Sequence, residues 1–208
     1  MAIFYLPFNQ AAADASFGTS GQTIVANTGK QAPWWKLGIG FLKKFEERNI
    51  RVLYRDSQQD LSSASIGTNI YITGHGEPGS LRIQARLDAP DPSLSPIDLA
   101  LQLDNRRLPK SFFGSIRIVA CSTGSGDLSF AQQFSEAMGV LGYRFCNIYG
   151  YTLDIAIAED LEHIRSTPGM EDATSYSKLA GDADTGTIAG TASQFRRRFD
   201  QNKNPFNR

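Results

Sequence analysis

The sequence predicts an α/β domain with a mainly parallel central sheet flanked by helices, because runs of strand type alternate with segments of helical periodicity. The expected strands are residues 1–8, 50–56, 69–73, 81–87, 115–120 and 144–151. The run SIRIVA at 115–120 is of the short apolar kind found in buried parallel strands. Residues 81–87 instead alternate apolar and polar side chains, which is typical of a half-exposed strand.

Three segments between these strands are predicted to be helices. The stretch from Pro33 to Asn49 has apolar residues at helical spacing and charged residues on the opposite side. Ser95 followed by Pro96 is a favourable helix start, and this helix is expected to stop near Leu108-Pro109. The third helix lies in DLSFAQQFSEAMGVLG, where Asp127 is a plausible N-cap.

One α/β domain is expected over residues 1–155. Within it, residues 9–32 are small and polar and are predicted to form a long loop or prosegment. Residues 156–208 are predicted to form a C-terminal extension that is partly irregular, beginning with a short helix at AIAEDLEHIR. The tail, residues 196–208, is expected to be exposed or disordered.

The composition is that of a soluble globular protein, with 41% apolar and 20% charged residues. The 21 basic and 21 acidic residues balance, which argues against a general nucleic-acid binder or a protein steered to membranes. No apolar run approaches the ~18 residues of a membrane span, and the N-terminus lacks the basic region of a signal peptide. We therefore expect a cytoplasmic protein, or one that is secreted or injected into a host cell without a classical signal peptide.

The stretch GHGEPG, residues 74–79, fits the letters of the dinucleotide-binding fingerprint G-x-G-x-x-G. That fingerprint requires a helix to open at the loop, because the pyrophosphate binds to free N–H groups at the helix N-terminus. Here the loop leads into a segment of strand-like alternation, and Pro78 lacks one of the N–H donors. Nucleotide binding therefore stays a minor alternative.

His75 and Cys121 each follow the carboxyl end of an expected strand, which is where ligands bind in open α/β sheets. By itself, each is an ordinary residue: histidine beside glycine often lies in a turn, and a cysteine that ends a strand is often a small core residue. Together, at the ends of strands expected to be neighbours, they favour a catalytic pair. A histidine and a helix N-terminus near a thiol would favour its thiolate, the form that attacks a carbonyl.

The matching stretches IYITGHG (70–76) and IRIVAC (116–121) resemble the caspase-like cysteine peptidases. This group includes caspases, gingipains, clostripain, separase and the autoprocessing domains of large bacterial toxins. The resemblance covers roughly residues 50–151 and implies a three-layer caspase-like fold. It also implies a dyad in which Cys121 forms an acyl-enzyme and His75 protonates the leaving amine. The backbone N–H groups of Gly76 and Cys121 would form the oxyanion hole.

The resemblance further implies that the P1 side chain of a peptide substrate binds beside the strands that carry His75 and Cys121 and near the strand that follows. Candidate substrate-binding residues are Asp154, Tyr149 and Tyr151. Asp154 would favour arginine or lysine at P1 through charge pairing. Cys146 is expected in the core, and no second Cys or His stands at ligand spacing, so neither a metal site nor a cofactor is expected.

The leading hypothesis is a cysteine endopeptidase of bacterial type, an effector or toxin-related protease whose partner is a protein or peptide substrate. A second hypothesis keeps the dyad but makes the chain an acyltransferase or a thioester or ester hydrolase. A third is a non-catalytic binding protein on the same fold. The sequence predicts neither the natural substrate nor the oligomeric state.

Overall fold

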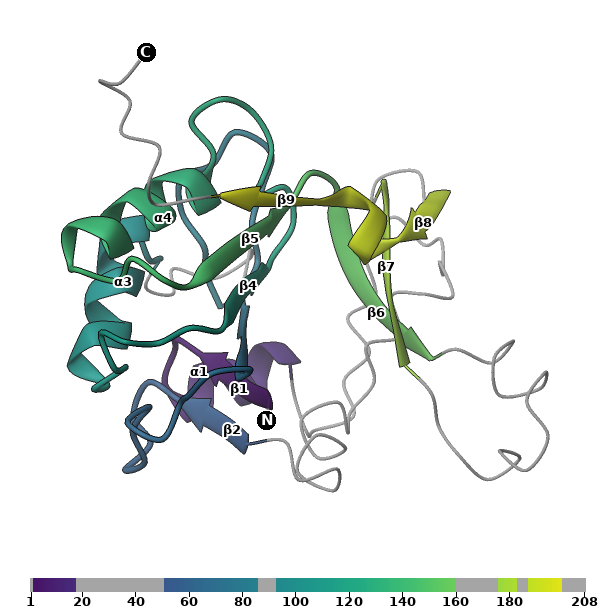
Figure 1. Ribbon diagram of the computed structural model, residues 1–208. Helices are drawn as coiled ribbons and strands as arrows, with labels where there is room; N and C mark the ends of the chain where they lie inside the picture. The colour runs from purple at the N-terminus through teal and green to yellow at the C-terminus, as the bar shows by residue number, and fades with distance from the viewer. Residues whose placement is uncertain (1, 18–50, 86–92, 160–175, 183–186, 200–208) are drawn as a thin grey trace, which may run out of the picture.

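The computed structural model describes residues 2–17, 51–85, 93–159, 176–182 and 187–199 (Figure 1). The strands are β1 (Ala2–Leu6), β2 (Arg51–Tyr54), β3 (Asn69–Thr73), β4 (Ser115–Val119), β5 (Asn147–Tyr151), β6 (Asp154–Glu159), β7 (Tyr176–Asp182), β8 (Thr187–Thr191) and β9 (Arg196–Phe199). The helices are α1 (Gln10–Phe17), α3 (Pro96–Asn105), α4 (Phe130–Val140) and the short 3-10 helix η2 (Ala192–Phe195). Among these residues no helix is long and apolar enough to cross a membrane.

The central sheet has six strands in the order β2-β1-β3-β4-β5-β9. The first five strands run parallel, and β9 pairs antiparallel with β5. This confirms the predicted α/β class with a mainly parallel sheet. Strands β6, β7 and β8 form a smaller antiparallel sheet. Figure 1 shows the chain leaving the large sheet after β5, forming the small sheet beside it, and returning through η2 into β9.

One face of the central sheet carries the hydrophobic core beneath α3 and α4 (Figure 1). Alternate residues of each strand point to this face, so isoleucines from neighbouring strands lie side by side and are fully buried. The sheet side of this core includes Ile70, Ile72, Ile116, Ile118 and Ile148, and the helix side includes Leu99, Leu103, Phe130, Phe134 and Met138. The β-branched strand residues and the apolar helix stripes were the sequence features that predicted these elements.

The opposite face of the sheet carries a row of aromatic and arginine side chains. The register places Phe4 beside Tyr71, Tyr71 beside Arg117, and Arg117 beside Tyr149. The rings of Phe4 and Tyr71 stack with centroids 5.9 Å apart. Arg117 donates to the Tyr71 hydroxyl at 2.8 Å and lies over its ring. The two faces therefore differ in chemistry: the strands present mainly isoleucines to the core, whereas the other face has a half-buried arginine beside aromatic rings.

The start of α3 was predicted correctly from sequence, but the cap of α4 was not. Ser95 and Asp98 form a capping box, in which the Ser95 Oγ accepts from the Asp98 N–H at 3.2 Å and the Asp98 carboxylate accepts from the Ser95 N–H at 3.0 Å. The Ser95 hydroxyl also donates to the Asp98 carboxylate at 2.6 Å, and this bond, together with that from the Ser95 N–H, lowers the pKa of Asp98. At α4 the cap is Ser129, which accepts from the N–H of Gln132, and not Asp127. An N-cap directly precedes the first helical residue, and Asp127 lies too early in the chain.

The long loop predicted for residues 9–32 is wrong at its beginning, because α1 occupies Gln10–Phe17. Asn9 starts this helix: its side-chain oxygen accepts from the N–H of Ala12 at 2.8 Å. The alanines that looked like loop composition also have the highest helix propensity, and with this cap the helix prevails. The rest of that loop and the helix predicted for residues 33–49 lie outside the described residues.

Two predictions for the C-terminal part are also wrong where the structure describes it. The predicted helix at AIAEDLEHIR begins as strand, because β6 runs to Glu159 and pairs along its length with β7. The tail expected to be exposed or disordered from residue 196 begins as the ordered strand β9, which completes the sheet against β5, although Arg197 and Arg198 are exposed as expected. Phe199 explains the difference, since its side chain is buried in the core beside α4. Residues 160–175 and 200–208 lie outside the described residues.

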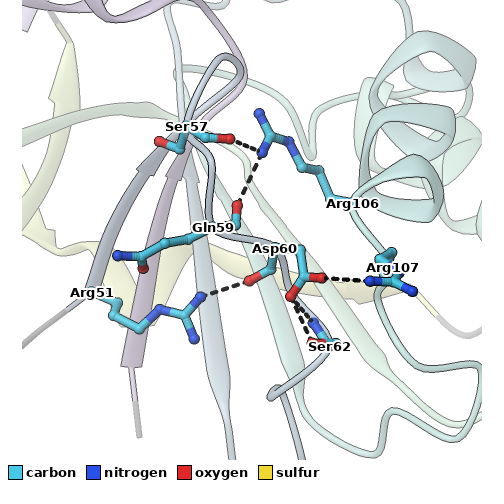
Figure 2. A network of polar contacts seen from close by, with 7 residues as sticks. All are labelled: Arg51, Ser57, Gln59, Asp60, Ser62, Arg106 and Arg107. Atoms are coloured by element: carbon cyan, nitrogen blue, oxygen red, sulfur yellow. Dashed lines mark hydrogen bonds and ion pairs between the residues drawn. The ribbon is translucent and has the colours of Figure 1, made fainter.

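Hydrogen bonds and an ion pair join the connection between β2 and β3 to the end of α3 (Figure 2). Arg106 follows α3 and donates to the backbone carbonyls of Ser57, Gln59 and Tyr54 at 2.5, 3.0 and 3.1 Å. Next to it, Arg107 makes an ion pair of 3.5 Å with Asp60, although its side chain is 78% exposed. Arg106 thus donates to three backbone carbonyls, whereas Arg107 makes one exposed ion pair.

Replacing Arg106 with alanine is expected to lower the free energy of unfolding by about 2 kcal/mol, since charge-assisted hydrogen bonds to three carbonyls are lost. Replacing Arg107 with alanine is the matched control and should change it by at most about 0.5 kcal/mol, as for an exposed ion pair. Urea unfolding of the two variants measures both values. Equal effects would contradict the assignment of Arg106 as the residue that holds this connection.

Candidate active site

His75 and Cys121 lie at the same end of two adjacent parallel strands. Every paired residue of β4 follows its partner on β3 by the same offset, as with Thr73 and Val119, and this offset of 46 also separates His75 from Cys121. The two residues therefore stand at equivalent positions just beyond the strand ends. The prediction that their strands are neighbours is confirmed.

Gly76 brings the histidine loop directly against the cysteine backbone. A Cβ at this position would lie 2.4 Å from the Cys121 carbonyl oxygen and 3.4 Å from the Cγ2 of Thr123. Because real Cβ atoms do not approach so closely, only glycine fits here without moving one of the two loops. The glycine after the histidine is thus required by packing.

The GHGEPG loop folds back as a hairpin and does not open a helix. The Ser80 N–H donates to the Glu77 carbonyl at 3.0 Å, and Gly79 has φ +75°, which makes EPGS a turn with proline and glycine at its two central positions. His75 and Gln84 then form an antiparallel bridge with hydrogen bonds of 2.7 and 3.0 Å. A phosphate cradle needs a helix N-terminus at this point, so the geometry argues against dinucleotide binding.

The alternation predicted for residues 81–87 holds from Arg82 to Ala85, without forming a regular strand, but not at Leu81. Ile83 and Ala85 are fully buried, whereas Leu81 and Arg82 are exposed. The segment makes isolated bridges, from Gln84 to His75 and from Ile83 to Leu94. It therefore acts as the second arm of the histidine loop.

The loop after Cys121 is hydrogen-bonded to the connection between β5 and β6. The Ser122 N–H donates to the Leu153 carbonyl at 3.2 Å, and the Ser125 hydroxyl donates to the Thr152 carbonyl at 2.8 Å. Ser122 has φ +55°, a conformation that costs energy for a residue with a side chain. This strained position, held on both sides, fixes the direction in which Cys121 leaves β4.

The Cys121 thiol is half-buried beneath the start of β6. Its Sγ accepts from the Ile155 N–H at 3.3 Å, and the Ile155 carbonyl lies 3.8 Å away. Burial raises the pKa of the Cys121 thiol to about 11, the charge of Asp154 adds to this, and the Ile155 N–H opposes it.

The prediction that the surroundings favour the thiolate of Cys121 is therefore wrong. The raised pKa favours the neutral thiol. The charged group that acts most strongly on Cys121 is an acid and not a cation. Helix α4 also begins only at Phe130, after the entire STGSGDLS loop, so its N-terminus does not follow the cysteine directly.

The backbone N–H groups predicted to form the oxyanion hole belong to Gly76 and Cys121. Among the backbone hydrogen bonds of turns and loops in the described residues, neither of these two N–H groups is a donor. The contact between the Gly76 position and the Cys121 backbone places the two peptides side by side. Close by, at the end of β3, the hydroxyl of Thr73 is buried and has no hydrogen-bond partner within the described part of the chain.

The three candidate substrate-binding residues occupy different places. Asp154 begins β6 beside the cysteine loop, where its carboxylate accepts from the Ser122 hydroxyl at 3.4 Å. Tyr151 contacts that loop through its backbone, while its ring is 2% exposed and packs against Val119 and Ala192. Burial raises the pKa of Tyr151, as expected for a core phenol.

Tyr149 lies on the aromatic face of the sheet, where the Arg196 guanidinium sits 4.4 Å from the centre of its ring. The side chain of Asp154 thus lies beside the cysteine loop, whereas the rings of Tyr149 and Tyr151 mainly pack against other side chains. Cys146, as predicted, is buried in the core.

Sequence reasoning missed Ile155 and Ser122, which surround the thiol with a backbone N–H and a strained turn. No local pattern marks a backbone donor that arrives from another sheet. Within the described ranges, no group of three or more His, Cys, Asp or Glu side chains could hold a metal ion. Comparison with protein-family models finds no match to this sequence, and comparison with curated proteins finds none.

Proposed function

We propose that this chain is a cysteine endopeptidase of the caspase-like type, with Cys121 as nucleophile and His75 as general acid and base. The observation that carries the proposal is the equivalent position of His75 and Cys121 at the ends of adjacent parallel strands, with Gly76 packed on the Cys121 backbone. Two chemical groups that are 46 positions apart in sequence share one end of the sheet. A nucleophile and its base must lie near each other, and this shared location supports the assignment of the pair.

The proposed reaction has two steps. In the first, Sγ of Cys121 attacks the scissile carbonyl carbon as the thiol proton leaves to His75, and the Gly76 and Cys121 N–H groups stabilise the oxyanion. His75 then gives a proton to the amine nitrogen, the C–N bond breaks and a thioester remains. In the second step His75 removes a proton from water, the hydroxide oxygen attacks the thioester, and the C–S bond breaks as His75 returns the proton to the sulfur.

The fold is compatible with this proposal. A mainly parallel six-stranded sheet carries α3 and α4 on one face, and the carboxyl ends of its strands are where ligands bind in open α/β sheets. The chain would act on a protein or peptide, in the cytoplasm or after export without a classical signal peptide, as bacterial effectors and toxin domains do.

The substrate preference proposed for the site is arginine or lysine at P1. Asp154 supports it, because its carboxylate is anchored beside the nucleophile loop through Ser122 and a carboxylate pairs with a basic side chain. A guanidinium can take both carboxylate oxygens in a forked arrangement, so arginine should be preferred to lysine.

A fluorogenic peptide library that varies P1 tests activity and preference together. Wild-type protein is expected to cleave peptides with Arg or Lys at P1 at least about a hundredfold faster than peptides with a neutral P1, since a buried polar site discriminates strongly when its partner is missing. Asp154→Asn should lose this preference. Asp127→Asn, an exposed acid in the cysteine loop, is the control and should keep it. A preference that survives in Asp154→Asn, or no cleavage of any peptide, would contradict the proposal.

A further inference from the structure

We propose that Asp154 couples the binding of a basic side chain to the reactivity of Cys121: its carboxylate keeps the thiol protonated in the empty site, and a bound guanidinium or ammonium releases it. The inference rests on the proposed function for the identity of the natural cation, a P1 arginine or lysine. The coupling itself is a property of the thiol and can be measured without any peptide substrate.

The residues before and after Asp154 are both hydrogen-bonded to the cysteine or its neighbour. Leu153, which precedes it, accepts the Ser122 N–H at 3.2 Å, and Ile155, which follows it, donates its N–H to the Cys121 Sγ at 3.3 Å. The Asp154 carboxylate itself accepts from the Ser122 hydroxyl at 3.4 Å. The acid is thus held beside the thiol by three separate hydrogen bonds and cannot move away independently of the cysteine loop.

The charge of Asp154 opposes ionisation of the thiol. A thiolate beside a carboxylate would place two negative charges in a half-buried site, so after burial itself Asp154 is the next cause that raises the pKa of Cys121. The N–H of Ile155 acts in the opposite direction, but burial and the carboxylate prevail.

The other titratable groups around the site come from the histidine and cysteine loops and from β9, where Arg197 donates to the Gly126 carbonyl at 3.0 Å. His75 stands at the equivalent strand end, Glu77 is exposed beyond it, and Asp127 is exposed beyond Cys121. The charge that raises the pKa of Cys121 is that of Asp154. The acid that would bind the basic side chain is therefore the one that restrains the nucleophile.

A cation paired with Asp154 would cancel the negative charge that opposes ionisation of the thiol. Removal of a like charge at close range lowers a pKa by about one unit or more. Far below its pKa, a thiol gains about tenfold in thiolate for each unit of decrease. The free protein would thus keep an unreactive thiol, and the preferred substrate would activate the group that attacks it.

Alkylation of Cys121 by iodoacetamide tests this coupling. The rate constant is measured against pH in the Cys146→Ser background, with the modified residue identified by peptide mass mapping. The probes are n-butylguanidinium, which has the charge and alkyl chain of an arginine side chain, and its neutral isostere n-butylurea. The measured quantity is the midpoint of the pH profile, because steric shielding by a bound probe changes the maximal rate and leaves the midpoint unchanged.

Saturating n-butylguanidinium is expected to lower the midpoint by about one pH unit, and n-butylurea should leave it unchanged. Asp154→Asn should show the lowered midpoint without any probe and no response to n-butylguanidinium. Asp127→Asn removes an exposed acid of the cysteine loop and should keep the response. An unchanged midpoint in wild-type protein with n-butylguanidinium would overturn the coupling. This measurement uses the wild-type residue at position 154, so it does not depend on whether an Asp154 variant folds.

The outcomes also separate this inference from the proposed function. A guanidinium-dependent midpoint in a protein that cleaves no library peptide would support the coupling and reject the peptidase. Cleavage after arginine with an unchanged midpoint would support the peptidase and reject the coupling.

Discussion

Replacing Cys121 with alanine, or His75 with alanine, is expected to lower the rate of peptide-bond cleavage by at least about a thousandfold. Losing one member of a nucleophile–base pair removes the covalent step or its proton transfer, and other interactions do not compensate. Both side chains are only half-buried at the strand ends, so the melting temperature should change by no more than about 4 °C, as for a stability change near 1 kcal/mol. Steady-state assays on a cleaved library peptide, with thermal unfolding by circular dichroism, measure both quantities.

Cys146→Ala is the matched control for this prediction, since the chain has two cysteines and this one is buried in the core. It should keep kcat/KM near that of the wild type while losing about 1 kcal/mol of stability through the small cavity it creates. Full activity in Cys121→Ala would show that this thiol is not the nucleophile. The same loss of activity in Cys146→Ala and Cys121→Ala would point to unfolding as its cause.

Gly76→Val is expected to lower kcat by about a hundredfold while leaving most of the fold intact. The new Cβ would meet the Cys121 carbonyl oxygen at 2.4 Å, so the histidine loop must move away from the cysteine. A displacement of the order of 1 Å between catalytic groups can cost about that factor in rate. The movement would also separate the two N–H groups of the proposed oxyanion hole.

Gly79→Asn is the control for this substitution, because Gly79 lies in the same loop with φ +75° but with open space around its Cβ position. Asparagine tolerates this backbone conformation, so activity should stay within about twofold of wild type. If Gly76→Val retains full activity, the close approach of the two loops is not needed for catalysis. The far-ultraviolet circular dichroism of both variants should match that of the wild type.

The central sheet could be predicted because its strands carry their own signals. IYIT and SIRIV are β-branched and apolar, and each ends at a small or polar residue, so their type and order followed from sequence. The cap at Ser95 was equally local, since all of its hydrogen-bonding partners lie within one helical turn. The equivalence of His75 and Cys121 then needed only that β3 and β4 be neighbours in register.

The parts that could not be predicted depend on contacts between distant segments. β9 is a strand because the edge of β5 pairs with it and because Phe199 reaches the core, and neither fact is visible in RRRF. The small sheet of β6, β7 and β8 likewise forms by pairing between segments with weak strand propensity. The neutral thiol was missed for the same reason, because Ile155 and Asp154 reach Cys121 from that small sheet.

The most direct test of the central claim is covalent labelling with a peptide acyloxymethyl ketone that carries arginine at P1. This probe alkylates an active-site thiol as its carboxylate leaves, so the adduct identifies the nucleophile by peptide mass mapping. A single adduct on Cys121, absent in Cys121→Ala and strongly slowed in His75→Ala, is the predicted result. Labelling of another residue, or none with any P1 side chain, would contradict the assignment of His75 and Cys121 as a catalytic dyad.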